Sequence, residues 1–401
     1  MKRRINVLAK VSVMAICIML ALVFISTVSV KAGSNDTVRV STAKELTAAI
    51  QNKDVEVIYL RTDAYIDIII NADKAAAGKY LYIYAPNVNI TNKAVFARID
   101  INEVNSFSEE VSGNNFYLPD YTYNKGIIVA ENITVNSIIL DGSDFKKSKY
   151  TLRKGAKVNE VELHYYGAGF PTSRYNKNKN LVTLKAVNKS GNKESYTVKL
   201  DKSGRIKKIT CTTDDKDTAF EYTFKYDENG NVIKYKGFDS EKGKFTTKNT
   251  YSGVLLKKSV TTAEELTETI INDYNEEGRL SRNETTTVYP GSSTYVSYVE
   301  YEYDKNGRCI TEKYSDPAGD DITVFKRTYN SKGFNTKSES IECNGLTGYK
   351  QVTTSIVKNK YSKAGDLIKH VTYDVGGEVT RTLEVTYDEL GNYVDSNEIF
   401  Y

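Results

Sequence analysis

The chain has 401 residues, enough for two or three domains, and it carries 55 Lys and Arg against 51 Asp and Glu. Five of the basic residues lie within the first 32 positions, so the rest of the chain has 50 basic and 51 acidic groups. A chain so close to neutral lacks the basic patch that nucleic-acid binding requires, and we therefore expect no nucleic-acid partner.

Residues 1–32 have the organisation of a secretory signal peptide. A basic start precedes an apolar run from Val11 to Val30, and Val30-Lys31-Ala32 resembles a cleavage site before Gly33. We therefore expect a mature chain that begins near Gly33, is secreted or held at the cell surface, and has no membrane segment after cleavage. The alternative is a membrane anchor formed by an uncleaved segment 11–30, because this run is close to spanning length.

Residues 33–145 begin with a short helix and continue with short apolar strands separated by Asn and Asp. The segment Ser41–Ile50 has a helical apolar stripe, and Thr42 and Glu45 have the spacing of a capping box. The strands predicted after this helix are Val55–Leu60, Tyr65–Ile70, Tyr80–Tyr84, Val88–Ile90, Val95–Ile101, Gly126–Val129 and Ile133–Leu140.

This order of elements resembles the N-terminal part of pectin-lyase-like right-handed β-helices over residues 37–145. The resemblance implies a short β-helix-like domain at 33–145, with an N-terminal capping helix and about five rungs of about 22 residues. Enzymes of that family use acidic Ca²⁺ ligands with an Arg or Lys base. The candidates in residue type are Asp63, Asp67, Arg98 and Asp100. The sequence does not assemble them into a matched set, so we assign no catalytic, cofactor-binding or metal-binding residues.

Residues 146–194 are predicted to form connecting strands and loops. The segment Val158–Tyr166 alternates apolar and polar residues as a strand does, whereas Lys146–Lys149 and Asn176–Asn180 have the polar, basic composition of solvated loops. No site is expected in this part of the chain.

Residues 195–401 contain eight copies of a pattern that reads Tyr-Asp-x-x-Gly-x-apolar. Asp, Asn or Ser at the first turn position and Gly three residues later are typical of a hairpin turn, and period-two alternation precedes the turn. Asn335 departs from the apolar ending, which suggests a register shift in that copy. The spacing runs from 23 to 32 residues, with copies that begin at Leu200, Tyr226, Tyr251, Tyr274, Tyr303, Tyr329, Tyr361 and Tyr387.

The copies resemble the YD repeats of the Rhs family and its relatives. The resemblance implies an antiparallel β-hairpin array of the kind that builds long sheets, sometimes closed into shells around a toxin or used at cell surfaces. Because the sequence stops at Tyr401, directly after the last copy, we do not expect a toxin-carrier role. A remnant of an Rhs-like secretion shell stays open as an alternative.

The cysteines and histidines give no positive signal for catalysis. Cys211, Cys309 and Cys343 are an odd number without paired spacing, so a Zn site is not expected. One disulfide is possible among them, but Cys309 occupies the apolar slot of its repeat and favours a buried free thiol. His164 and His370 lie in strand-like segments, and we expect both on strand surfaces. We therefore expect no enzyme activity and no cofactor.

The sequence as a whole predicts an all-β protein with a short right-handed β-helix-like domain followed by a YD-type hairpin array. We expect a structural, adhesive or ligand-binding function without catalysis, with an extracellular glycan or a surface protein as the partner. Exposed Tyr rows suit glycan binding, although core packing explains them equally well. The alternative is a degenerate polysaccharide lyase or other carbohydrate-active β-helix protein.

Overall fold

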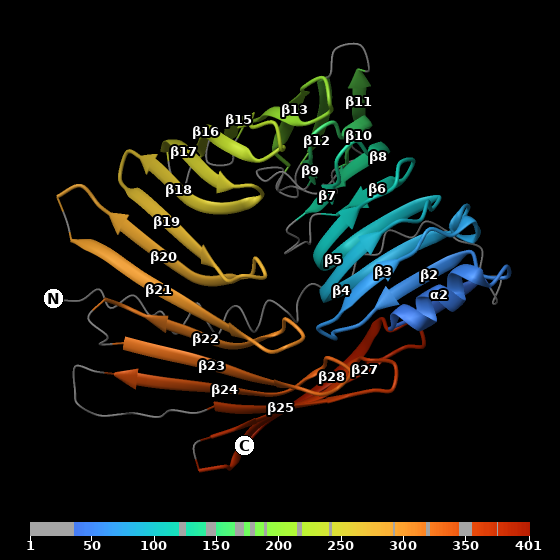
Figure 1. The fold of residues 1–401 in the computed structure, drawn as a ribbon, viewed down its shortest axis with the longest axis vertical. Coiled ribbons are helices and arrows are strands. Elements are labelled where there is room, and N and C mark those ends of the chain that lie inside the picture. The colour runs from blue at the N-terminus through green and yellow to red at the C-terminus, as the bar shows by residue number, and fades with distance from the viewer. Residues whose placement is uncertain are drawn as a thin grey trace.

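The computed structural model describes residues 36–119, 126–141, 150–164, 172–176, 181–187, 191–214, 219–239, 243–291, 293–317, 321–344, 355–374 and 376–401. The predicted signal segment and its cleavage site lie outside these ranges. Nearly all regular elements in the described part of the chain are strands, which confirms the predicted all-β class (Figure 1).

The first part of the chain is a parallel β-solenoid with two faces. The first face contains β1 (Thr37–Val40), β2 (Val57–Arg61), β4 (Tyr80–Asn92), β5 (Arg98–Glu109), β6 (Asn115–Leu118), β8 (Thr134–Asp141) and β10 (Lys157–His164). The second face contains β3 (Asp67–Ile70), the distal halves of β4 and β5, β7 (Ile127–Val129) and β9 (Tyr150–Leu152). The strands β4 and β5 run through both faces, with register shifts near Tyr84 and Ala85 where β4 passes from one to the other.

The solenoid core forms because alternate residues of each strand point inward. Ile58, Leu81 and Ile99 occupy the same position on successive strands, and all three are fully buried. The rings of Phe107 and Phe116 meet edge to face with their centroids 5.7 Å apart. The intervening residues point outward, so the polar and aromatic side chains of the first face lie on the surface of the solenoid.

The helix α2 (Ala43–Gln51) confirms the predicted helix and its capping box. The Glu45 N–H donates to Thr42 Oγ1 over 3.2 Å, and the Thr42 N–H donates to Glu45 Oε2 over 3.2 Å. Leu46, Ala49 and Ile50 are buried against the solenoid, and a short 3₁₀ turn, η1 (Lys74–Ala76), follows β3. None of the helices in the described part of the chain has the length and apolarity needed to cross a membrane.

Several boundaries within the solenoid differ from the sequence prediction. The segments Tyr80–Tyr84 and Val88–Ile90 belong to the single strand β4, because the chain bends there without leaving the sheet. The strands β1 and β6 were not predicted. Residues 150–164, assigned to a connecting segment, supply β9 and β10, so the parallel strands continue beyond residue 145.

The described residues of the second part of the chain form one antiparallel sheet of 18 strands, in which each strand pairs with its neighbours in sequence. This order confirms the predicted meander of hairpins. The strands are β11 (Thr172–Asn176), β12 (Leu181–Val187), β13 (Lys193–Leu200), β14 (Ile206–Thr213), β15 (Phe220–Tyr226), β16 (Val232–Asp239), β17 (Gly243–Ser252), β18 (Leu255–Ala263), β19 (Thr267–Tyr274), β20 (Leu280–Val288), β21 (Thr294–Tyr303), β22 (Cys309–Ser315), β23 (Asp321–Tyr329), β24 (Asn335–Asn344), β25 (Ser355–Tyr361), β26 (Leu367–Tyr373), β27 (Val379–Tyr387) and β28 (Tyr393–Phe400).

The repeated motif forms the turns at one end of these hairpins. Gly230, Gly307 and Gly391 have φ angles of 78°, 79° and 80°, as the turn chemistry predicts. In the copy that begins at Tyr226, the side chain of Asp227 accepts the Asn231 N–H over 2.8 Å and fixes the turn. The glycines of the other five copies also have positive φ: Gly204, Gly253, Gly278, Gly333 and Gly365.

The structure corrects two details of the repeat prediction. A ninth turn of the same type lies between β26 and β27, where Asp374 Oδ1 accepts the Glu378 N–H over 2.8 Å and Gly377 has a φ of 83°. This turn lies at the opposite end of the strands from the eight motif turns, because the motif turns on either side of it connect β25 to β26 and β27 to β28. The register shift expected in the copy with Asn335 is present between Thr328 and Tyr329, but the copy with Tyr303 and Cys309 has the same shift, so it does not distinguish this copy.

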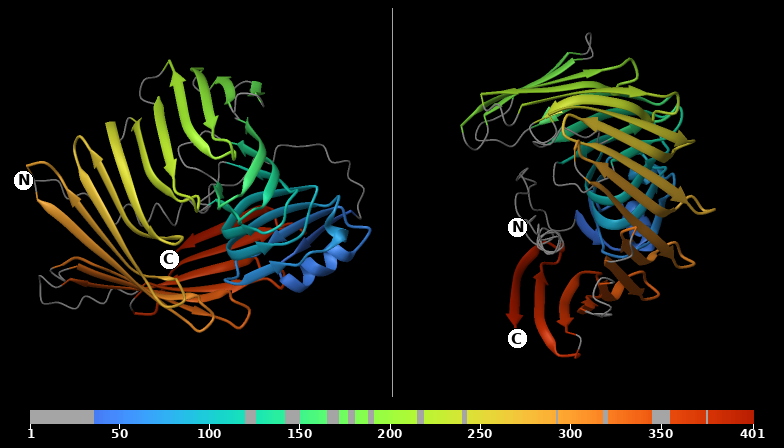
Figure 2. Two further views of the ribbon diagram at one scale, coloured as in Figure 1. Left: turned by 45° about the horizontal axis from the view of Figure 1, so that its top comes forward. Right: turned by 90° about the vertical axis from the view of Figure 1, so that its left-hand side faces the viewer.

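The antiparallel sheet starts at the last solenoid strand and curves back to the first solenoid turns (Figures 1 and 2). At its start, β11 and β12 contact β10. Towards its end, the Tyr65 N–H donates to the Gly333 carbonyl over 2.8 Å, and the rings of Tyr65 and Tyr329 lie 4.8 Å apart. The two parts of the chain therefore meet at both ends of the sheet.

Candidate functional site

The first face of the solenoid carries a column of aromatic and charged side chains. Parallel pairing aligns Tyr59 with Tyr82, then with Asp100 on β5 and with Tyr117 on β6. The rings of Tyr59 and Tyr82 are stacked, with centroids 4.8 Å apart and planes 15° from parallel. We call this surface the aromatic face, and it comprises Tyr59, Tyr80, Tyr82, Tyr84, Arg98, Asp100 and Tyr117.

The tyrosines of the aromatic face are partly open to solvent. Tyr80 is 42% exposed and Tyr84 is 36% exposed, while Tyr59 and Tyr82 are half-buried. Burial and the nearby carboxylate of Asp100 raise the pKa of Tyr82 to about 12. The phenol therefore stays neutral at physiological pH and keeps its O–H as a hydrogen-bond donor.

An ion pair lies in the middle of the aromatic face. Arg98 Nε and Nη2 donate to the two carboxylate oxygens of Asp100 over 2.5 and 2.9 Å, and the guanidinium carbon lies 4.6 Å from the ring centroid of Tyr117. Burial raises the pKa of Asp100 to about 6, although Arg98 acts in the opposite direction. The Tyr117 hydroxyl in turn donates to Asp141, so the column is tied together laterally.

An open polar groove adjoins the aromatic face. The Ser137 hydroxyl donates to Asn115 Oδ1 over 2.9 Å, and Asn136 donates to the Gly113 carbonyl over 2.6 Å. Asn136 is exposed, so its side chain also has room to contact a ligand. The groove is lined by Asn115, Asn136, Ser137, Asn159 and Glu160.

The structure brings together only two of the four residues suggested by the β-helix resemblance. Arg98 and Asp100 form the ion pair described above. Asp67 lies on the second face, where it is exposed and accepts a hydrogen bond from Asn89 over 2.8 Å. Asp63 follows β2 and lies close to Asp366 and Leu367 of the antiparallel sheet. Within the described ranges, no group of three His, Cys, Asp or Glu is arranged to hold a metal ion.

The histidines and Cys309 lie in strands. His164 Nε2 is 3.3 Å from a carboxylate oxygen of Glu162, and His370 Nδ1 is 3.0 Å from Asn359 Oδ1. Burial, with the charge of Arg381, lowers the pKa of His370. Cys309 is a free thiol that is half-buried, and burial raises its pKa to about 11, so it is a poor nucleophile at neutral pH.

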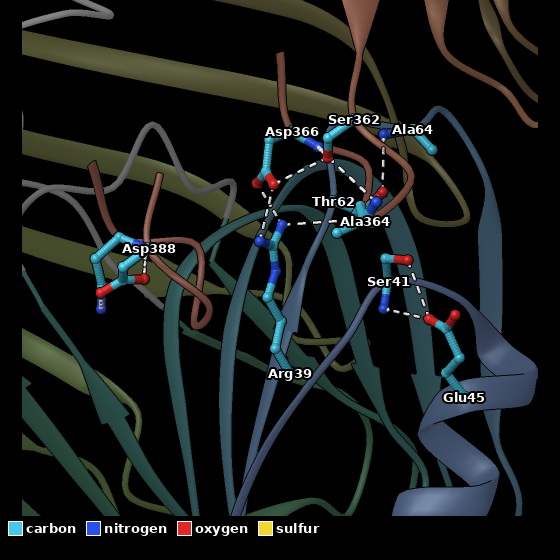
Figure 3. Close-up of polar contacts among 10 residues, drawn as sticks. Arg39, Ser41, Glu45, Thr62, Ala64, Ser362, Ala364, Asp366 and Asp388 are labelled. Atoms are coloured by element: carbon cyan, nitrogen blue, oxygen red, sulfur yellow. Dashed lines mark hydrogen bonds and ion pairs between the residues drawn. The ribbon is translucent and has the colours of Figure 1, made fainter. Parts of the chain in front are cut away.

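A second polar cluster joins the solenoid to the last hairpins (Figure 3). Arg39 Nη1 donates to Asp366 Oδ2 over 2.9 Å, and Nη2 donates to Asp366 Oδ1. The Ser362 hydroxyl also donates to this carboxylate over 3.1 Å. The side chains of Arg39 and Asp366 are 7% and 8% exposed, so this ion pair is largely withdrawn from water.

The same cluster reaches the edge of the aromatic face. The guanidinium of Arg61 lies 4.7 Å from the ring centroid of Tyr84 on the solenoid and 5.8 Å from that of Tyr387 on β27. Burial and the nearby Asp366 raise the pKa of Asp63 to about 6, against the influence of Arg61 and Arg39. We call Arg39, Arg61, Asp63, Asp366 and Tyr387 the junction.

The first residue of the repeat motif has a role that sequence reasoning missed. The Tyr303 hydroxyl donates to the Leu280 carbonyl over 2.8 Å, so this Tyr bonds to the strand that follows the preceding turn. This explains why the motif uses Tyr rather than Phe. The same bond joins Tyr226 to Ile206, Tyr251 to Val232, Tyr274 to Leu256, Tyr329 to Cys309 and Tyr361 to Asn335.

Comparison with known proteins does not place the chain in a family. The sequence matches no family model and no curated protein. A porin-like protein from Bacteroides vulgatus ATCC 8482 is 14% identical, with a TM-score of 0.24, over 52% of this chain and 98% of that chain. A porin-like protein from Bacteroides uniformis ATCC 8492 is 12% identical, with a TM-score of 0.24, over 55% and 97%. The structure of TcdB2-TccC3-TEV is 11% identical, with a TM-score of 0.18, over 56% and 16%.

Proposed function

We propose that this chain is a secreted or cell-surface protein that binds a glycan on the aromatic face and does not cleave it. The observation that carries the proposal is the stacked pair of Tyr59 and Tyr82, which lies on a partly exposed sheet face. Five of the seven side chains of this face are tyrosines, which lie on β2, β4 and β6. A regular, rigid row of aromatic rings suits a repeating ligand.

The chemistry of the face fits a sugar chain. The C–H face of a sugar ring packs on an aromatic ring, and a phenol O–H group such as that of Tyr80 hydrogen-bonds to sugar hydroxyls. The neighbouring groove supplies amide, hydroxyl and carboxylate groups from Asn136, Ser137 and Glu160. A ligand site needs both apolar contact and a few polar groups that fix orientation.

The absence of catalysis is part of the proposal and rests on how Arg98 is held. A lyase needs a base that is deprotonated, so that it can remove a proton from the sugar. Burial lowers the pKa of Arg98, but the hydrogen bond and the charge of Asp100 raise it above its ordinary value. Arg98 is therefore held as a cation by its partner, which does not suit it to act as that base.

The remaining features of the proposal follow from the sequence. The signal-like segment 1–32 supports export with cleavage near Gly33, and the YD-type motif supports a repeat array that acts as a scaffold for the solenoid. A surface protein remains the alternative partner. A degenerate lyase is the competing function, and a remnant of a secretion shell is the other alternative.

Glycan screening of the chain from Gly33 onward tests the proposal. The purified protein is exposed to bacterial and plant glycans, with binding and the release of unsaturated or shortened products measured in parallel. We expect binding to at least one glycan without products, and loss of that binding in a Tyr82→Leu variant. Products formed by the wild type and abolished by Arg98→Gln or Asp100→Asn would support the lyase instead. Binding to no glycan at all would contradict the proposal.

A further inference from the structure

The repeat turns contain a recurring ion pair. In two copies an Asp at the first turn position pairs with an Arg four residues later: Asp201 with Arg205 and Asp304 with Arg308, each with an N–O distance of 2.6 Å. Each of these guanidinium groups also lies 5.0 Å from the ring centroid of the next motif Tyr. The Arg is therefore neutralised within its own turn.

One copy departs from this arrangement. Arg279 has the same position in its turn and lies 5.8 Å from the ring centroid of Tyr303, but the first turn residue is Asn275. Asn275 Oδ1 accepts the backbone N–H of Arg279 over 2.8 Å and supplies no negative charge. Among the residues that the structure describes, the half-buried Arg279 side chain has no hydrogen-bond or ion-pair partner. Its charge is not compensated as the charges of Arg205 and Arg308 are.

This guanidinium lines a pocket between two successive turns. The pocket also contains Ser281, Tyr301 and Tyr303, with Lys305 at its exposed edge. Of its two acidic residues, Asp304 is already bound by Arg308 and by the N–H groups of Asn306 and Arg308, while Glu277 is exposed. Arg279 and Lys305 thus outweigh the single unpaired carboxylate, and the pocket has a net positive charge.

We propose that this pocket binds the carboxylate of an acidic sugar. A guanidinium presents paired N–H donors that match the two oxygens of a carboxylate, and the ring of Tyr301 offers a surface on which the sugar packs. The carboxylate takes the place that the turn Asp occupies in the copies with Arg205 and Arg308. This site lies in the antiparallel sheet, apart from the aromatic face, and does not depend on it.

Two variants of the same turn test the site. Asn275→Asp installs the residue found in other copies, so it should neutralise Arg279 from within while preserving the fold. Arg279→Gln removes the charge. Lys363→Gln is the matched control, because Lys363 is exposed and has the position of Lys305 in another turn. Thermal unfolding of each variant verifies that it is folded, and Asn275→Asp should be at least as stable as the wild type.

The probe is an oligogalacturonate, compared with its fully methyl-esterified form by isothermal titration calorimetry. To separate this site from the aromatic face, all variants are made in a Tyr82→Leu background. We expect the acid to bind at least tenfold more tightly than the ester, and this preference to disappear in Asn275→Asp and Arg279→Gln but not in Lys363→Gln. Equal binding of acid and ester would overturn the proposal, as would unchanged affinity in Asn275→Asp. Binding of poly-glutamate but not of the oligogalacturonate would contradict the proposal that the ligand is an acidic sugar.

Discussion

Arg39 on the first strand of the solenoid and Asp366 in the turn before β26 form a buried two-pronged ion pair between residues 327 positions apart. In the copies with Arg205 and Arg308, the cation comes from the turn itself. In the turn of the copy that begins at Tyr361, Asp366 has the position that Arg205 and Arg308 have in theirs, and the solenoid supplies the arginine. This exchange links the last hairpins to the solenoid.

We expect Asp366→Asn to destabilise the protein by about 3–5 kcal/mol, because it leaves the buried Arg39 without a countercharge. Urea unfolding measured at neutral pH checks this value. Glu384→Gln is the control, since Glu384 and Lys369 form an exposed ion pair across β26 and β27. It should change the free energy of unfolding very little, and an equal loss in both variants would contradict the role of the junction.

The junction should also make stability depend on pH. Burial raises the pKa of Asp63 from 3.8 to about 6, so the folded state binds this proton more tightly than the unfolded state. The contribution of Asp63 to stability therefore falls as the pH rises from about 4 to 6. Asp63→Asn removes this loss and should be more stable than the wild type by about 1–2 kcal/mol at pH 7, a figure reduced for partial solvent access.

The test of this pH dependence is a series of urea unfolding curves between pH 4 and pH 8. The advantage of Asp63→Asn over the wild type should shrink towards zero near pH 4, because the wild-type carboxyl is then protonated in the folded state. An advantage that is constant across the series, or that grows as the pH falls, would contradict the assignment.

The hydroxyl of a motif Tyr should contribute measurably to stability. Tyr303→Phe leaves the Leu280 carbonyl without its side-chain donor and should cost about 1 kcal/mol. Tyr295→Phe is the matched control, because the Tyr295 ring is 61% exposed and its hydroxyl makes no hydrogen bond within the described residues. Thermal unfolding of the two variants should separate them, and equal midpoints would refute a role for the bond.

Two turn glycines should differ in their tolerance of a side chain. Both Gly230 and Gly253 have positive φ, but a Cβ at Gly230 would lie 1.8 Å from the Leu152 carbonyl oxygen, whereas no atom of the described residues lies within 4 Å of one at Gly253. Gly253→Ala should cost about 1 kcal/mol from backbone strain alone. Gly230→Ala should cost clearly more, because the solenoid backbone must also move. Similar unfolding midpoints for the two variants would show that this turn does not pack on the solenoid.

Local features of the fold were predictable from the sequence, and distant contacts were not. The capping box of Thr42 and the positive φ of Gly307 depend on neighbouring residues, so residue types at short spacing were sufficient. The turn at Gly377 fits the motif but was missed, since it falls between two regularly spaced copies. The strand Asn115–Leu118 is too short and too polar at its start to stand out in the sequence.

The aromatic face depends on information that the sequence does not contain in local form. Tyr59 and Tyr82 stack because the rungs of the solenoid have lengths that align them, and those lengths vary along the chain. Asp63 and Asp67 are four residues apart but lie on either side of a corner. Residue type alone therefore grouped them wrongly with Arg98 and Asp100.

The most direct test of the account is calorimetric titration of the wild type, a Tyr59→Leu/Tyr82→Leu variant and a Tyr289→Leu/Tyr295→Leu variant with the glycan selected by screening. The second pair is the control, because Tyr289 and Tyr295 also contact each other, with centroids 6.0 Å apart, but lie at the exposed far end of a hairpin. We predict that only the solenoid pair abolishes binding and that the glycan recovered from the wild type keeps its length. Equal affinity in all three proteins, or a shortened glycan, would contradict the account.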